Sequence, residues 1–257
     1  MTDPKETFFF HRHETAEAFE RSLEKEYLTH YRGEEVIGEG TTKTMYRTSA
    51  LGMIRDISPD AKFICLLRNP IERAWSHYIY RVQHQRRPPT KTFSEVIRNE
   101  KHDENKALEV GIVELGRYWT YVRRLAEQFA AERIHIILSS DLFDDPNTQM
   151  AETFRFLGVD SSVKLDFGEI HNASSYPGSP SLYRTLYSAW KPIKKSLPKA
   201  LRKAINKPVQ QVRSLLLKTG PKKLAMDPAD RQYLQELYRE PNRRLEEWLD
   251  RDLLHWT

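Results

Sequence analysis

The sequence predicts a single α/β domain with a central, mainly parallel sheet flanked by helices. Two short and nearly continuous apolar runs, Ala61–Arg68 and Ile134–Leu138, have the composition of strands that are buried on both faces. Segments with apolar residues at helical spacing alternate with these runs along the chain. Such alternation is typical of a parallel sheet that helices cover on both sides.

The remaining elements follow in order from their local patterns. A third, shorter strand is expected at Glu35–Gly38, where Val36 and Ile37 precede a glycine. Four helices are expected from the spacing of apolar residues: Ser49–Ile57, Pro70–His84, Leu115–Ala130 and Thr148–Leu157.

The C-terminal part of the chain has a different composition. After a 1–160 nucleotide-binding core, residues 161–226 are expected to be irregular and then to form short basic helices broken by prolines. The last part, 227–257, is expected to be helical from Asp227 to Leu254, with a restart near Pro241 because proline lacks the backbone N–H of a helix interior.

Composition limits the partners and the compartment. The 257 residues carry a net charge of +5, which favours anionic partners. The basic segment 184–223 contains no Asp or Glu, and it is either a solvated helix face or a surface for an acidic glycan or peripheral membrane contact. Cys65 is the one cysteine, which excludes an internal disulfide and a cysteine-based zinc site and fits a cytoplasmic location. No apolar run approaches the ~18 residues of a membrane span.

The corner between the strong strand and the next helix has features of an anion site. The strand ends at Arg68, Asn69 is a good N-cap and Pro70 suits the first helical position. Arg73 and Ser76 lie three residues apart, off the apolar stripe of this helix. Because ligands of open α/β sheets bind at the carboxyl ends of strands, this corner can hold an anion. An ordinary strand–helix turn with a surface arginine explains the pattern equally well.

The segment RNPIERAWSHY resembles the 3′-phosphate-binding segment of sulfotransferases that use 3′-phosphoadenosine 5′-phosphosulfate (PAPS). The resemblance is to the bacterial and heparan-sulfate-type carbohydrate branch. It implies that Arg68 and Ser76 bind the 3′-phosphate, with Arg73 in a supporting role.

Other stretches resemble further landmarks of that family, and together they cover most of Lys5–Trp256. They are KETFFF, SPDAKFICLLRNP, GIVELGRY, IILSSDL, FRFLG and the Tyr and Trp pattern of the last helix. The resemblance implies a three-layer fold like that of P-loop NTPases.

The stretch VIGEGTTKTMYR, residues 36–47, contains Gly-Thr-Thr and at first sight matches a phosphate loop. The family, however, has its 5′-phosphosulfate loop ahead of the KETFFF-like segment, and a different element here. That element carries the proposed general base of the heparan-sulfate-type enzymes. The resemblance therefore implies that Glu39 is the base and Tyr46 the accompanying tyrosine. Gly40 stands where the family often has lysine, and Lys43 is a candidate replacement.

No Lys-x-Gly-Thr precedes KETFFF, so the first strand and the phosphate loop of the family are expected to be missing from this chain. A late start of the sequence is the simplest explanation. A degenerate protein, or a loop supplied by another chain, are the alternatives, and the activity of the chain as given depends on which holds.

The function expected from these features is transfer of a sulfuryl group from PAPS to a hydroxyl or amine of an acceptor, a carbohydrate by resemblance. No metal is required, and nucleic acid is not expected as substrate. The pair His11 and His13 is expected to be a surface pair. Two rival functions stay open: a non-catalytic protein that binds 3′-phosphoadenosine 5′-phosphate (PAP), and a P-loop kinase or nucleotidase that uses Gly40–Lys43 as its phosphate loop.

Overall fold

The computed structural model describes residues 6–12, 16–30, 36–84, 91–103, 111–163, 165 and 225–256. The basic segment 184–223 and His13 lie outside the described residues, so the predictions made for them stay predictions. The chain divides into two units: one comprises 1–68, 102–165 and 240–253, and the other comprises 69–101, 166–239 and 254–257. Each unit is described by itself.

The sheet of the first unit confirms the prediction of parallel strands. Strands β1 (Phe63–Leu67) and β2 (Ile134–Leu138) pair in parallel, with Phe63 opposite Ile134 and Leu67 opposite Leu138. Along β1, Cys65 and Leu67 are buried, whereas Ile64 and Leu66 are 43% and 56% exposed. The predicted burial of both faces is therefore wrong for β1, whose side chains alternate with the two-residue period of a strand.

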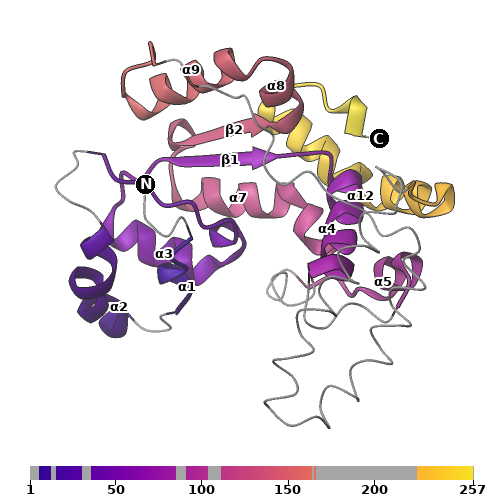
Figure 1. Ribbon diagram of the computed structural model, residues 1–257, viewed down its shortest axis with the longest axis horizontal. Helices are drawn as coiled ribbons and strands as arrows, with labels where there is room; N and C mark the ends of the chain where they lie inside the picture. The colour runs from indigo at the N-terminus through magenta and orange to yellow at the C-terminus, as the bar shows by residue number, and fades with distance from the viewer. Residues whose placement is uncertain are drawn as a thin grey trace, which may run out of the picture. The chain divides into compact units, whose positions relative to one another are not determined.

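Helices lie on both sides of this sheet (Figure 1). Helix α7 (Tyr118–Gln128) lies on one side, and α8 (Ser139–Asp144) and α9 (Pro146–Leu157) lie on the other. The ring of His135 on β2 stacks on Phe156 of α9 at 5.1 Å between centroids. Asp145 caps α9 by accepting the Thr148 N–H, and Pro146 takes the first helical position. The flanked parallel sheet is the predicted α/β architecture.

The N-terminal part of the first unit is helical. It contains α1 (Phe9–Arg12), α2 (Ala16–Ser22), the short turns η1 (Leu23–Tyr27), η2 (Leu28–His30) and η3 (Thr44–Tyr46), and α3 (Thr48–Ile57). Short turns also precede α7 and β2, at η4 (Glu114–Gly116) and η5 (Ala131–Arg133). The α3 prediction is confirmed within one residue.

The predicted third strand is wrong over its described residues, Val36–Gly38. These residues have no strand partner among the described residues, and both Val36 and Ile37 are exposed. Two β-branched residues are too few to specify a strand when no neighbouring backbone completes the hydrogen-bond ladder.

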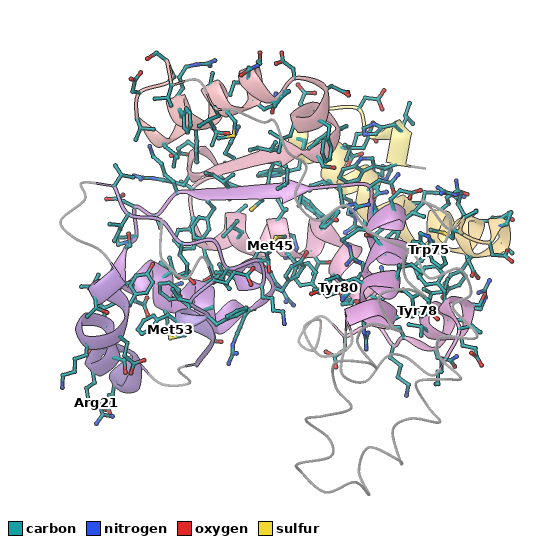
Figure 2. All side chains as sticks on the ribbon, in the orientation of Figure 1. Arg21, Met45, Met53, Trp75, Tyr78 and Tyr80 are labelled. Atoms are coloured by element: carbon teal, nitrogen blue, oxygen red, sulfur yellow. The ribbon has the colours of Figure 1, made fainter. Side chains whose placement is uncertain are left out.

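In the second unit, α4 (Pro70–His84) has the predicted bounds. The Asn69 side chain accepts the N–H groups of Ile71 and Glu72 at 2.9 and 3.2 Å, which makes it the predicted N-cap. On the α4 side that faces α5 (Phe93–Asn99), Trp75 and Tyr78 pack against Phe93 at 4.9 and 5.3 Å between ring centroids (Figure 2). Figure 2 shows Tyr80 on the same helix.

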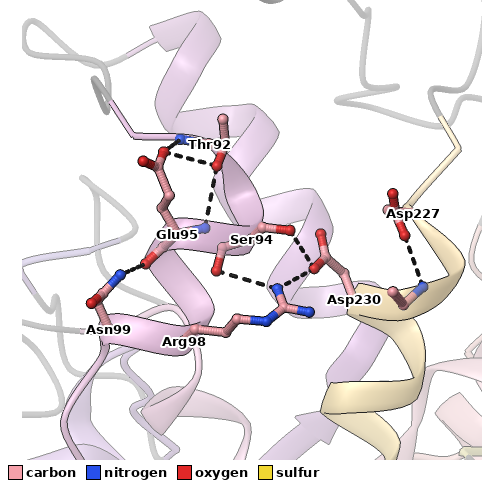
Figure 3. Close-up of polar contacts among 8 residues, drawn as sticks. Thr92, Ser94, Glu95, Arg98, Asn99, Asp227 and Asp230 are labelled. Atoms are coloured by element: carbon pink, nitrogen blue, oxygen red, sulfur yellow. Dashed lines mark hydrogen bonds and ion pairs between the residues drawn. The ribbon is translucent and has the colours of Figure 1, made fainter.

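A polar network holds the start of α5 to the start of α12 (Pro228–Leu249), as Figure 3 shows. Thr92 and Glu95 form a capping box at α5, and Asp230 accepts hydrogen bonds from Ser94 and Arg98. The chain ends in the turn η6 (Leu254–Trp256).

The predicted helix restart near Pro241 is wrong. Helix α12 runs through Pro241 without interruption. Pro241 removes only one backbone N–H from the helix. Ion pairs from Glu240 to Arg243 and Arg244, three and four residues further on, span the proline and stabilise the helix there.

Candidate active site

Glu39 lies in the loop that joins the first helices to α3. The loop is fastened to the N-terminal segment in two places: the Thr7 hydroxyl donates to Oε1 of Glu39 at 2.7 Å, and the Thr42 hydroxyl donates to Oε1 of Glu6 at 3.1 Å. Residues about 35 positions apart in sequence are thereby held together, since the two hydrogen bonds span 32 and 36 residues.

The two carboxylate oxygens of Glu39 have different surroundings. Oε1 accepts the hydroxyls of both Thr7 and Thr41. Oε2 is also buried, yet no described residue donates a hydrogen bond to it. Buried polar atoms in proteins nearly always have a partner, and a catalytic role is one of the explanations for an exception. The carboxylate thus has one oxygen that accepts two hydroxyls and one buried oxygen that has no donor among the described residues.

The loop Gly40–Lys43 does not have the arrangement of a phosphate loop. The hydroxyls of Thr41 and Thr42 are directed to Glu39 and Glu6, and the backbone N–H of Thr44 donates to the Thr41 carbonyl. The three-residue turn η3 separates the loop from α3, whereas a phosphate loop leads directly into the N-terminus of a helix. Lys43 is exposed. These contacts argue against a role for this loop as the phosphate-binding loop of a kinase.

Tyr46 is anchored beside a buried carboxylate. Its hydroxyl donates to the Leu115 carbonyl at 3.0 Å, and its ring meets that of Tyr121 at 4.7 Å between centroids. The Tyr121 hydroxyl in turn donates to Glu114 at 2.8 Å, and His102 bonds the other oxygen of Glu114. Burial and the neighbouring Glu114 raise the pKa of Tyr121 well above its usual range. These contacts fix Tyr46 against the backbone of Leu115 and the ring of Tyr121.

Arg68 and Ser76 belong to different units of the chain. Arg68 directly follows β1 and is exposed, as a residue that meets an external anion must be. Ser76 lies on α4 and is half-buried, as is Arg73. Asn69 already occupies the N–H groups of Ile71 and Glu72, so the helix N-terminus offers fewer free donors than the sequence pattern predicts. Their joint role as a 3′-phosphate site stays a prediction.

The remaining observations concern Cys65, metal ligands and membrane-spanning helices. Cys65 is buried on β1 and is a core residue as predicted, and this burial raises the pKa of its thiol to about 12. Within the described residues, no group of three His, Cys, Asp or Glu side chains could hold a metal ion. The described part of the chain also has no helix that is long and apolar enough to cross a membrane.

Sequence reasoning missed Thr7, Thr41 and the cluster of His102 and Glu114. Thr41 follows Glu39 by two residues, and a hydroxyl at that spacing can reach the carboxylate. No pattern predicts the contact with Thr7, because it depends on how the two segments fold together.

Comparisons with known proteins agree with this picture. The sequence profile of the sulfotransferase domain matches residues 47–248. A bifunctional heparan sulfate N-deacetylase/N-sulfotransferase 1 from Xenopus laevis is 32% identical over 108 residues, which are 41% of this chain but 12% of that protein.

A crystal structure of a sulfotransferase from Alicyclobacillus acidocaldarius has a similar fold. The TM-score is 0.61 at 22% identity, and the match covers 95% of this chain and 74% of that one. Since the profile spans most of the chain and the fold agrees, the chain belongs to the sulfotransferase family.

Proposed function

We propose that the protein transfers a sulfuryl group from PAPS to a hydroxyl or amine of a carbohydrate, with Glu39 as the general base. One observation carries the proposal: Oε2 of Glu39 is buried and has no hydrogen-bond donor among the described residues. Leaving such an acceptor unpaired costs about 1–3 kcal/mol. A bound acceptor molecule would supply the missing donor.

The chemistry requires a base in this role. A hydroxyl is a weak nucleophile while it keeps its proton, and a carboxylate at hydrogen-bond distance accelerates attack by typically 10²–10⁴-fold. Oε2 takes the acceptor proton while the acceptor oxygen or nitrogen forms the new bond to sulfur. The bond between sulfur and the 5′-phosphate oxygen breaks, and its electron pair leaves with that oxygen as PAP. All atoms and charges are accounted for without a metal or a redox partner.

On the donor side, the proposal uses residues at the start and the middle of one strand–helix segment. PAPS supplies the activated sulfuryl group. The exposed guanidinium of Arg68 and the hydroxyl of Ser76 bind its 3′-phosphate, because a guanidinium and a hydroxyl are strong donors to phosphate oxygens. Arg73, on the same helix as Ser76, supports them.

The acceptor is proposed from the name of the matched relative and from the net charge of the chain. The matched relative is named as an enzyme of heparan sulfate, which points to an amine or hydroxyl of a glycan, although the match spans a small part of that protein. The net charge of +5 favours an anionic glycan.

The test is transfer of radiolabelled sulfuryl from PAPS to two matched polysaccharides. N-desulfated heparan sulfate offers free amines, and its re-N-acetylated form offers hydroxyls alone. We expect incorporation into at least one of them, and at least a 100-fold loss in Glu39→Gln. No incorporation into either polysaccharide, or undiminished transfer by Glu39→Gln, would overturn the proposal.

Calorimetry separates the donor site from the rival functions. PAP should bind more tightly than Mg-ATP, and Arg68→Ala and Ser76→Ala should each weaken PAP binding by roughly 10-fold or more, the loss expected of a hydrogen bond to a charged group. Tighter binding of Mg-ATP would favour a kinase or nucleotidase. PAP binding without transfer would favour a non-catalytic protein.

A further inference from the structure

We propose that Thr7 and Thr41 are positioning residues that fix the carboxylate of Glu39 so that Oε2 faces the acceptor. This inference rests on the proposed function, because it assigns the residues that prepare the base. It concerns three side chains within one unit of the chain.

Both threonines are buried and both donate to the same oxygen. Thr7 is 4% and Thr41 is 9% exposed, and both hydroxyls donate to Oε1 of Glu39, one from 32 residues away in sequence and one from two residues away. A carboxylate oxygen has about two lone-pair sites, so two donors satisfy Oε1. The plane of the carboxylate is then fixed, and the oxygen left for a substrate proton is Oε2.

The proton of the Thr7 hydroxyl is committed to Glu39. The backbone N–H of Phe9 donates to this hydroxyl oxygen at 3.1 Å, which occupies it as an acceptor and leaves its single proton for Oε1. The segment itself is rigidly packed, since the rings of Phe9 and Phe10 lie 4.9 and 5.3 Å from that of Tyr27. Thr7 is thus a preorganised donor.

Neutral donors suit this role better than a cation would. A lysine or arginine on Glu39 would form an ion pair and hold the carboxylate in its charged form, which weakens it as a proton acceptor. Hydroxyl donors orient the group with a smaller effect of that kind. Among the described residues, the hydrogen-bond partners of Glu39 are the two threonines, and no lysine or arginine pairs with it.

The neighbouring pair of Thr42 and Glu6 offers a matched control. It ties together the same two segments by a threonine-to-carboxylate hydrogen bond, but it is exposed and does not contact Glu39. Removal of this hydroxyl changes the anchoring of the loop and leaves the base untouched.

The experiment compares Thr7→Val, Thr41→Val and Thr42→Val in the labelled transfer assay. Valine keeps the shape of threonine and removes the hydroxyl. We expect kcat to fall roughly 10- to 100-fold in Thr7→Val and in Thr41→Val, as for loss of a hydrogen bond to a charged group, while PAP affinity stays unchanged. Thr42→Val should behave as the wild type.

Conservative variants and Glu39→Gln make the outcomes distinct. Thr7→Ser and Thr41→Ser keep a hydroxyl and should restore most of kcat, which a purely steric role does not predict. If Glu39→Gln is inactive while both valine variants keep the wild-type kcat, the positioning role is wrong and the proposed function stands. If the wild type transfers nothing, or Glu39→Gln is fully active, the proposed function and this inference fall together.

Discussion

The stability of the second unit should depend strongly on Asp230. Its carboxylate is 5% exposed and accepts hydrogen bonds from Ser94 and Arg98 (Figure 3). Loss of the hydroxyl bond to a charged acceptor costs about 1.5–3 kcal/mol. The Arg98 pair adds about 0.5–1 kcal/mol, because that guanidinium is 40% exposed and screened by solvent. We therefore expect Asp230→Ala to lower the free energy of unfolding by about 3 kcal/mol.

Glu236→Ala on the same helix is the matched control. Its ion pair with Arg239 is exposed on both sides, so its removal should change the free energy by less than about 1 kcal/mol. Urea titration followed by circular dichroism gives both free energies, and the melting temperature should fall by roughly 6–12 °C in Asp230→Ala alone. Equal and small losses in the two variants would refute the reasoning that burial makes the Asp230 network strong.

Two further predictions concern titratable groups. The Cys65 thiol, whose pKa burial raises to about 12, should resist iodoacetamide at about pH 8 in the folded protein and react once urea unfolds it; rapid labelling of the folded chain would contradict its placement. Burial lowers the pKa of His135 below its ordinary value of 6.5, so the unfolded chain binds the proton more readily than the folded chain. The stability that is present above pH 6.5 is therefore lost as the pH falls through the pKa of the folded state. His135→Gln should reduce the loss of unfolding free energy between about pH 7.5 and 5.5, and an equal loss in both proteins would disprove this role.

The elements that sequence predicted well are those with strong local signals. Strand β2 has its predicted bounds because four of its five residues are apolar, which suits a strand of a parallel sheet between helices. Helix α4 has its predicted bounds because Asn69 and Pro70 mark its start, independent of the rest of the fold.

The errors have physical reasons as well. Val36 and Ile37 have strand propensity, but a strand also needs a neighbouring strand with which to pair. Local propensity does not supply that neighbour. Helix α5 was missed although Thr92 and Glu95 stand at the spacing of a capping box, a signal that was present in the sequence.

The candidate site was predictable in part. Chain order along a family resemblance selected Glu39, and the structure then showed a carboxylate with one oxygen occupied and one buried without a donor. Thr7 could not be found in this way. It is 32 residues from Glu39, and its contact depends on the packing of Phe9 and Phe10, which no local pattern encodes.

The central claim is that Glu39 removes the acceptor proton during sulfuryl transfer. Single-turnover transfer from bound, labelled PAPS to saturating N-desulfated heparan sulfate measures the chemical step without product release. The account predicts that Glu39→Gln binds PAP as the wild type does and transfers the label at least 100-fold more slowly. A single-turnover rate within a few-fold of the wild type would contradict it.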